Sequence, residues 1–448
     1  MSFPRYPSYR DSGVEWLGEV PEHWQVMPLK RDIEFVTSGA RGWAENYADD
    51  GDLFIRIGNL TRDTIRLDLS DIQRVTVPDS AEVARTQVQS GDVLFSITAY
   101  LGSVAVVPSG LGRAFVSQHV ALARPHGNRL RPEWIAYVTA SHVGKTCLEM
   151  LGYGGTKVQL SLGDVANLLV TVPPLYEQEA LVRFLDRETA KIDALVAEQE
   201  NLIGLLKEKR QAVISHAVTK GLDPSVPMKD SGVEWLGEVP EHWEVAALNY
   251  RFEVLLGKML DEKRITGNHL APYLRNVDVQ WDRINVDELP QMDFEGDDIE
   301  RYALRAGDLL VCEGGEVGRA AIWTGALDEC YYQKALHRLR PREPLRDVSR
   351  FQFYLLNVAA MLGIFTGGQG KATIAHLTAE SLRRYRFPYP PCAEQIQIVH
   401  VLDEESKKFD ALVAEAQSAI ALLQERRTAL ISAAVTGQID VRQAMPIA

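Results

Sequence analysis

This 448-residue sequence lacks the features that define disulfide-stapled, zinc-bound and membrane-embedded proteins. Its four cysteines are Cys147, Cys312, Cys330 and Cys392. None of them stands in a CxxC pair, so neither a disulfide framework nor a zinc site is predicted. No apolar run approaches the roughly 20 residues that cross a bilayer. The segment Met1–Gly13 has no apolar core and is not expected to be a signal peptide. These absences favour a cytoplasmic globular protein without a metal.

A basic excess is also lacking, because the net charge is −13 at neutral pH. Nucleic acid attracts basic surfaces, so the total charge argues at first against DNA binding. The distribution of charge changes that conclusion. Residues 37–172 (the first insert) hold 12 Lys/Arg and 13 Asp/Glu, and residues 256–388 (the second insert) hold 18 and 19. Both inserts are therefore nearly neutral, and DNA binding would require local basic patches within them.

What the sequence does contain is a tandem duplication. The 14 residues DSGVEWLGEVPEHW (the opening segment) occur at 11–24 and again at 230–243, which chance cannot produce in a chain of this length. A second block, Glu177–Thr219, is matched by Glu394–Thr436. The two inserts lie between these blocks and have diverged heavily. One frame with two different inserts indicates a molecule that applies one geometry to two different targets.

The second repeated block predicts a long helix in each half. Apolar residues recur on one heptad position in both copies, which predicts a seam that pairs with another helix. Paired prolines at 173–174 and 390–391 precede the helices, and Gly221 and Gly437 follow as helix stops. About 43 residues at about 1.5 Å each make a rod of roughly 65 Å, and we expect the two rods to pair with each other. The seam residues are Leu185, Ile192, Leu206 and Val213, then Leu402, Phe409, Leu423 and Leu430, with Leu195, Leu202 and Leu412 on the adjoining position.

The inserts have the pattern of mixed α and β structure. Short β-rich segments punctuated by glycine and proline predict strands. The expected strands are 53–57, 93–97, 104–107, 309–311 and 320–323, and the expected helices are 132–141 and 349–362. Four correspondences predict one fold with two different surfaces: Ile55-Arg56 with Leu274-Arg275, GDVLF at 91–95 with GDLLV at 307–311, Gly102 with Gly318, and Arg124-Pro125 with Arg340-Pro341.

The fold class is therefore α+β, with two globular domains, two long helices and an internal repeat of pseudo-two-fold symmetry. The predicted domains are 1–36 (first repeated segment), 37–172 (first globule), 173–221 (long helix), 222–255 (linker and second repeated segment), 256–388 (second globule) and 389–448 (second long helix and tail).

The full length of the chain resembles the specificity subunit of type I restriction–modification systems. Three paired features carry the resemblance: the two EWLGEVPEHW openings, the two GD-hydrophobic…G…G cores at 91–102 and 307–318, and the two PPxxEQ helix starts at 173–178 and 390–395. The order opening, insert, helix is the family's order in both halves. Each element alone is weak, but the combination is highly specific.

The resemblance implies two target recognition domains, each reading one half of a split DNA site in a host-defence complex. It implies that the long helices form an antiparallel coiled coil that fixes the spacing of the half-sites. Two modification subunits, which are N6-adenine methyltransferases, and two restriction subunits, which are motors and nucleases, would assemble around this frame. No cofactor is expected in this chain, because S-adenosylmethionine, ATP and Mg²⁺ would belong to those partners. The chain would be a non-catalytic component.

Candidate DNA-binding residues are Arg, Lys, Asn and Gln on loops, because these side chains contact phosphates and base edges. The alternative is that most of them solvate the surface, and Arg56 and Arg275 could instead form a structural ion pair shared by both copies. Base readout should use positions where the inserts differ, which favours Tyr100, His119 and Asn276. Lys157 and Lys371 follow glycine-rich turns whose N–H groups suit a phosphate. The candidates are Arg41, Arg56, Asn59, Arg62, Tyr100, Gln118, His119 and Lys157, with Lys258, Arg275, Asn276, Gln333, Lys334 and Lys371.

The repeated tryptophans, Trp16, Trp24, Trp235 and Trp243, could stack on bases. Their identical surroundings would give both half-sites the same contact, however. We therefore assign them to packing against the helix ends or to contacts with the modification subunits.

Two rival functions remain. A DNA methyltransferase would need an Asn/Asp-Pro-Pro-aromatic motif, but Val172–Tyr176 reads VPPLY, with valine where the polar residue is required. TGGQGKAT at 366–373 lacks the spacing of a phosphate-binding loop, and DEK at 261–263 is too short to define a nuclease. The second rival is a coiled-coil scaffold that displays two protein-binding globules, which the acidic frame permits.

Overall fold

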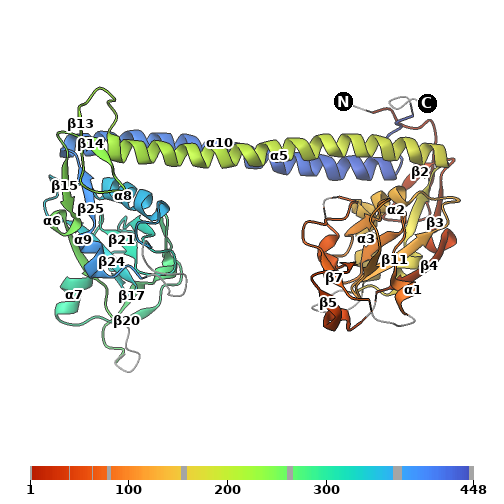
Figure 1. Ribbon diagram of the computed structural model, residues 1–448, viewed down its shortest axis with the longest axis horizontal. Coiled ribbons are helices and arrows are strands. Elements are labelled where there is room, and N and C mark those ends of the chain that lie inside the picture. The colour runs from red at the N-terminus through yellow and green to blue at the C-terminus, as the bar shows by residue number, and fades with distance from the viewer. Residues whose placement is uncertain are drawn as a thin grey trace. The chain divides into compact units, whose positions relative to one another are not determined.

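A computed structural model describes residues 3–39, 41–62, 64–77, 82–152, 159–259, 266–366 and 376–442. The chain divides into two units, the first comprising Met1–Glu200 with Gln417–Ala448 and the second comprising Asn201–Ala416. Each unit holds one opening segment, one insert and part of each long helix (Figure 1). The duplication in the sequence is therefore a duplication of structural units.

The first unit is built around two four-stranded sheets with the strand orders β4-β11-β8-β9 and β10-β6-β7-β5. The first sheet is antiparallel, and the second contains one parallel pair, β10 with β6. Two further pairs join β1 to β2 and β3 to β12. The strands are β1 Tyr9–Asp11, β2 Glu19–Pro21, β3 Gln25–Pro28, β4 Ile33–Ser38, β5 Tyr47–Ala48, β6 Asp52–Ile55, β7 Gln73–Val75, β8 Val93–Ser96, β9 Val104–Val106, β10 Ala114–Val116, β11 Val120–Pro125 and β12 Leu169–Val172. The short helices are α1 Glu82–Thr86, α2 Pro132–Ala140, α3 His142–Leu151 and α4 Leu162–Asn167.

The second unit repeats this plan with the sheets β16-β24-β21-β22 and β20-β17-β23, in which β17 and β23 are parallel. Three two-stranded pairs complete it: β13 with β14, β15 with β25 and β18 with β19. The strands are β13 Met228–Asp230, β14 Glu238–Pro240, β15 Glu244–Ala247, β16 Phe252–Leu256, β17 Leu270–Leu274, β18 Val279–Gln280, β19 Arg283–Ile284, β20 Gln291–Asp293, β21 Leu309–Cys312, β22 Ala320–Ile322, β23 Tyr331–Tyr332, β24 Leu336–Pro341 and β25 Arg386–Tyr389. The short helices are α6 Leu248–Arg251, α7 Asp297–Tyr302, α8 Ser349–Met361 and α9 Ala379–Arg384.

The central strand of each insert is buried on both faces. Val93 and Phe95 of β8 join the core cluster that also contains Trp134 of α2, whereas Leu94 joins a separate cluster on the other side of the sheet. A strand covered on both faces has no polar alternation, and this explains why GDVLF continues as an unbroken apolar run. The structure confirms four predicted elements, with ends that differ by at most one residue from the prediction: the strands at 93–97 and 309–311 and the helices at 132–141 and 349–362.

The two long helices are α5, Leu175–Lys220, and α10, Cys392–Val435, which lie side by side in Figure 1. Asp193 pairs with Arg427 at 3.1 Å in the first unit, and Arg210 pairs with Asp410 at 2.6 Å in the second. The glycine stops are confirmed, because Gly221 and Gly437 have φ values of +80° and +72°. None of the described helices is apolar over enough of its length to span a membrane.

The seam between the long helices is narrower than the heptad pattern suggests. Ile192 and Phe409 are buried, as expected, and Ala416, which interrupts the apolar pattern, is buried as well. The adjoining heptad position is largely open, since Leu202 and Leu412 are 42% and 46% exposed. The named seam residues are therefore buried or half-buried, whereas Leu202 and Leu412 on the adjoining position face outward.

Candidate nucleic-acid interface

Parallel strands end together at one edge of each insert. In the first insert β6 runs parallel to β10, so the residues after Ile55 and Val116 emerge at the same place. In the second insert β17 runs parallel to β23, with the same result after Leu274 and Tyr332. We call these places the first and second strand-end edges. Most of the predicted DNA-binding residues lie on them.

A four-residue turn, Ser117–Val120 (the first edge turn), lies at the centre of the first edge. The Val120 N–H closes the turn by donating to the Ser117 carbonyl oxygen at 3.0 Å. Three other main-chain hydrogen bonds join it to its neighbours: Ser117 N–H to the Ile55 oxygen (2.9 Å), Ile97 N–H to the His119 oxygen (3.2 Å) and Gly39 N–H to the Val120 oxygen (3.3 Å). The backbone is thus fixed on several sides, while the side chains of Gln118 and His119 are exposed.

The second edge turn, Gln333–Leu336, is held in the same way. Its closing bond runs from the Leu336 N–H to the Gln333 oxygen at 3.0 Å. The equivalent neighbouring bonds are Gln333 N–H to the Leu274 oxygen (3.1 Å), Glu313 N–H to the Ala335 oxygen (3.0 Å) and Gly257 N–H to the Leu336 oxygen (3.0 Å). Lys334 occupies the place of Gln118 and is exposed.

Two glycines make these turns possible by close approach. A Cβ on Gly257 would lie 2.3 Å from the Gln333 carbonyl oxygen, and one on Gly39 would lie 1.8 Å from the Val116 oxygen. We expect Gly257→Ala to lower the free energy of unfolding by about 1–3 kcal/mol, because main-chain atoms must move apart. Urea denaturation tests this against Gly204→Ala, which meets no atom within 4 Å on helix α5 and should stabilise by about 0.5–1 kcal/mol. An unchanged stability of Gly257→Ala would contradict the close packing.

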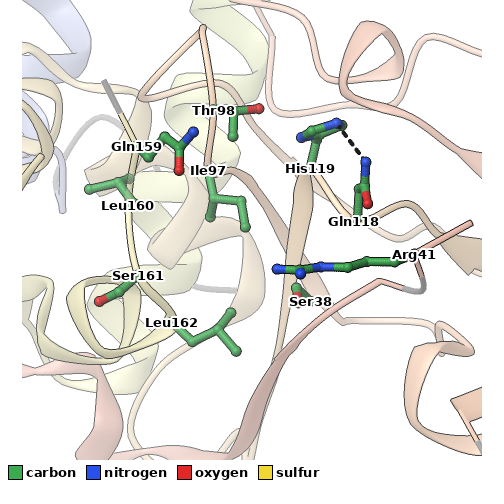
Figure 2. Close-up of a pocket in the computed structure, with 10 residues that line it drawn as sticks. All are labelled: Ser38, Arg41, Ile97, Thr98, Gln118, His119, Gln159, Leu160, Ser161 and Leu162. Carbon is green, nitrogen blue, oxygen red and sulfur yellow. Dashed lines mark hydrogen bonds between the residues drawn. The ribbon is translucent and has the colours of Figure 1, made fainter. Parts of the chain in front are cut away.

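A polar cleft of about 510 Å³ adjoins the first edge turn and is lined by Arg41, Gln118 and His119. Figure 2 shows these three side chains on one side of the view and Gln159 and Ser161 on the other. The Gln118 amide donates to Nε2 of His119 at 3.1 Å. Within the described part of the chain, the Gln118 carbonyl oxygen has no further hydrogen-bond partner. Acceptors and donors of this kind suit the edges of bases.

A second hollow of about 250 Å³ places Arg56 beside the same turn, together with Trp43 and Tyr47. Gln118 and His119 line both hollows. The structure therefore brings Arg41, Arg56, Gln118 and His119 into one neighbourhood.

The arginine that follows the first parallel strand is used differently in the two inserts. Arg275 donates two hydrogen bonds to the Asp278 carboxylate, at 2.9 and 2.8 Å, and these bonds raise the pKa of Arg275. In the first insert Arg56 takes the place of Arg275, but the residue in the place of Asp278 is Asn59, which carries no charge. Arg56 instead lies 3.6 Å from the exposed carboxylate of Asp71. The geometry favours the structural ion pair for Arg275 and leaves Arg56 more available to a ligand.

Two predicted asparagines are occupied within the fold. Asn59 is 3% exposed, and its amide donates to two main-chain oxygens in 68–71 at 2.8 and 3.0 Å. Asn276 donates to the Gly314 oxygen at 3.0 Å and accepts from Arg319 at 2.9 Å. Both side chains hold loops in place, so the geometry favours a structural role for them.

Other candidates differ in how far their charge is neutralised. Arg62 and Tyr100 are both exposed and form a cation–π pair, with the guanidinium 4.2 Å from the ring centroid. Lys258 forms an ion pair with Asp298 at 2.7 Å and lies 4.9 Å from the centre of the Phe294 ring. The charge of Lys258 is therefore satisfied within the second insert. Lys157 and Lys371 lie outside the described residues, and their phosphate contacts stay predictions.

The opening segment of the first unit binds the start of helix α5. The Trp24 indole N–H donates to the Glu177 carboxylate at 2.8 Å, and His23 Nε2 lies 2.8 Å from the other carboxylate oxygen. Trp24 is fully buried, whereas Trp16 is partly buried against the same core cluster. These tryptophans pack at the helix start.

The second unit repeats this arrangement. The Trp243 indole N–H donates to Glu394 at 3.1 Å, and His242 lies 2.8 Å from the same carboxylate. Trp235 packs edge-on against Phe387, with ring centroids 5.9 Å apart. The repeated segment thus serves to fasten each insert to its helix.

Sequence analysis used the EQ pair only as part of the repeated PPxxEQ helix start and assigned it no contact, although its identity in both copies was a signal for a shared structural role. Glu177 receives the opening segment, and the adjacent Gln178 holds the insert. The Gln178 amide donates to the Arg129 oxygen at 2.7 Å and accepts from the Arg131 N–H at 2.8 Å. Gln395 makes the corresponding bonds in the second unit. Gly39 and Gly257 were also missed, because their role depends on strands distant in sequence.

Comparison with known proteins shows the family of the chain. A family model described as the type I restriction modification DNA specificity domain matches residues 21–203 and 240–420. The putative type I restriction enzyme MjaX specificity subunit of Methanocaldococcus jannaschii is 21% identical over 95% of this chain and 96% of its own length. The EcoKI specificity subunit of Escherichia coli is 22% identical over 95% of this chain and 91% of its own length.

Solved structures agree in fold. A chain from a study of complex assembly and conformational transition in the type I restriction–modification system has a TM-score of 0.70 at 18% identity, covering 93% of this chain and 98% of that one. The HsdS subunit from Thermoanaerobacter tengcongensis has a TM-score of 0.54 at 17% identity, with the same coverage. The chain therefore belongs to the family of type I restriction–modification DNA specificity proteins, whose role is DNA recognition rather than catalysis.

Proposed function

We propose that this chain directs methyltransferase and restriction subunits to an asymmetric, split DNA site. Each insert reads one half-site through its strand-end edge, and the paired helices set the distance between the halves. One observation carries the proposal: two turns with equivalent main-chain hydrogen bonds carry different exposed side chains, Gln118 and His119 in one insert and Lys334 in the other. The shared main-chain arrangement gives both inserts the same binding geometry, and the different side chains let them recognise two different DNA sequences.

The charge distribution suits binding that depends on partners. The acidic excess lies in the repeated frame, while the first edge carries an exposed cation at Arg41 and the same insert exposes Arg62. Phosphate contacts supply most of the affinity of DNA-binding proteins. We therefore expect this chain to bind DNA tightly only when its methyltransferase partners are present. Tight binding of some protein through both inserts would instead favour the scaffold.

The outer faces of the long helices suit partner subunits. In the second unit Leu202, Leu205 and Leu412 are 42%, 54% and 46% exposed, and in the first unit Leu195 and Leu422 are similarly open. We assign these leucines to contacts with the modification subunits. In this proposal two modification and two restriction subunits bind S-adenosylmethionine, ATP and Mg²⁺, and this chain binds none of them.

The first experiment is to co-express the chain with its cognate modification subunit in a host that lacks DNA methylation. Long-read sequencing then maps N6-methyladenine, and the modification subunit alone serves as the control. We expect a split motif of two unlike half-sites around a fixed, unspecified gap. A continuous motif would show that the two-reader arrangement is wrong, and a soluble complex without methylation would favour the scaffold.

A further inference from the structure

We infer that the central residues of each edge turn determine the base preference of that half-site. Gln118, oriented by His119, selects adenine in the first half-site, and Lys334 selects guanine in the second. This inference rests on the proposed function, because it names the specificity-determining residues of the same two sites.

The two edge turns are equivalent positions in a common frame. Each is closed by one hydrogen bond of 3.0 Å and held by three others, from the adjacent parallel strand, from the central strand and from a close-packed glycine. Gln118 and Lys334 are both the second residue of their turn. A side chain on a rigid support discriminates bases better than one on a mobile loop, because its geometry is fixed before binding. The frame is thus constant, and the residue on it varies.

Neighbouring polar side chains on the second edge are already occupied. Arg275 is bonded to Asp278, and Asn276 bridges Gly314 and Arg319. Lys334 differs from them, since it is exposed and has no ion pair among the described residues. Lys334 is therefore a cation that, within the part of the second insert that the structure describes, a ligand can engage without breaking an internal ion pair.

The chemistry of the first turn fits adenine. A carboxamide donates and accepts side by side, which matches the N7 acceptor and N6 donor that adenine presents in the major groove. The hydrogen bond from the Gln118 amide to Nε2 of His119 fixes the direction of the amide plane. The Gln118 carbonyl oxygen keeps its capacity to accept, and the second amide proton keeps its capacity to donate.

The chemistry of the second turn fits guanine. An ammonium group only donates, and guanine presents two acceptors, O6 and N7, in the major groove. Ala335 stands where His119 stands in the first turn, so no ring fixes the Lys334 side chain. Its ammonium group is free to reach either acceptor.

The test exchanges the two residues in the co-expressed complex with the modification subunit. Gln118→Lys should shift one position of the first half-site from adenine toward guanine, by roughly ten- to hundredfold in relative methylation, and leave the second half-site unchanged. Lys334→Gln should make the converse change in the second half-site alone. Gln89→Lys is the matched control. Gln89 is exposed in the same insert, but it lies before the start of β8, and the first strand-end edge adjoins the other end of that strand. The control variant should keep the wild-type motif.

A wild-type split motif that neither exchange alters would overturn the inference while the proposed function stands. A wild-type complex without a split motif would remove the proposed function and the inference together. If an exchange merely blocks methylation, the variant Gln118→Ala still tests the inference. We measure competition binding of DNA by the complex that contains this variant, and we expect it to lose the preference for one base at a single base pair only. A uniform loss of affinity for all sequences would identify a phosphate contact and overturn the inference.

Discussion

Replacing Glu177 with alanine is expected to lower the stability of the first unit by about 3–5 kcal/mol, the range for removing one partner from a buried charged network. The Glu177 side chain has no exposed surface. It accepts the Trp24 indole N–H at 2.8 Å and lies 2.8 Å from His23. Without the carboxylate, the buried indole N–H loses its acceptor, and the opening segment loses its attachment to helix α5.

The same carboxylate also joins the chain's two end segments. The Tyr6 hydroxyl donates to the Glu177 carboxylate at 3.4 Å, and the Arg442 guanidinium lies 3.6 Å from the same carboxylate. Burial and the negative charge of Glu177 both raise the pKa of Tyr6, so its hydroxyl remains a neutral donor. Arg442 is itself held by Asp440 through two bonds of 2.9 and 2.6 Å. Loss of the Glu177 carboxylate therefore removes a contact from four side chains at once: Trp24, His23, Tyr6 and Arg442.

The second unit supplies a matched control in Glu394→Ala. Glu394 bonds Trp243 and His242 as Glu177 bonds their counterparts, but its side chain is 27% exposed and pairs with no arginine among the described residues. Water can replace part of what is lost, so we expect a cost of about 1–2 kcal/mol. Hydrogen–deuterium exchange resolves the two units and measures both costs in the full chain. Equal losses would mean that burial and the Arg442 contact do not distinguish the two sites.

The elements that sequence patterns predicted well are those defined by local periodicity. The helix stops at Gly221 and Gly437, the buried strand at 93–96 and helix α2 follow from spacing and turn chemistry alone. The edges were harder to predict, because loop side chains take partners from distant strands. Asn276 was favoured for readout because the inserts differ there, but its amide is held by Arg319, 43 residues away.

The constant offset of 216 residues between the two GD motifs and between the two Arg-Pro pairs places Gln118 opposite Lys334, but only the structure shows that both lie in equivalent turns. Aligned position by position, the segments around them, AFVSQHVALARP and CYYQKALHRLRP, are identical only in the final Arg-Pro. Strand register aligns them, because Val116 pairs with Ile55 as Tyr332 pairs with Leu274. Heptad counting had a similar limit, since it identified leucines without showing which of them face the partner helix and which face outward.

Shortening both long helices by two heptads is expected to abolish methylation at the wild-type motif. The deletion removes Val196–Lys209 from α5 and Ala411–Gln424 from α10, which keeps the pairs Asp193–Arg427 and Arg210–Asp410. Fourteen residues are four turns of a coiled coil, so the seam keeps its phase. Each helix loses about 21 Å, the length of about six base pairs of DNA.

Six base pairs also rotate a half-site by more than half a turn, because B-DNA has about 10.5 base pairs per turn. The two inserts would then meet half-sites on different faces of the duplex. We expect any residual methylation to mark a motif whose gap is shorter by about six base pairs, and a variant that duplicates the two heptads to lengthen it equally. Circular dichroism and co-purification with the modification subunit check that each variant folds and assembles. If the complex with the shortened chain assembles and still methylates the original motif with its original gap, the helices do not set the spacing. The distance between half-sites must then be fixed by the modification subunits.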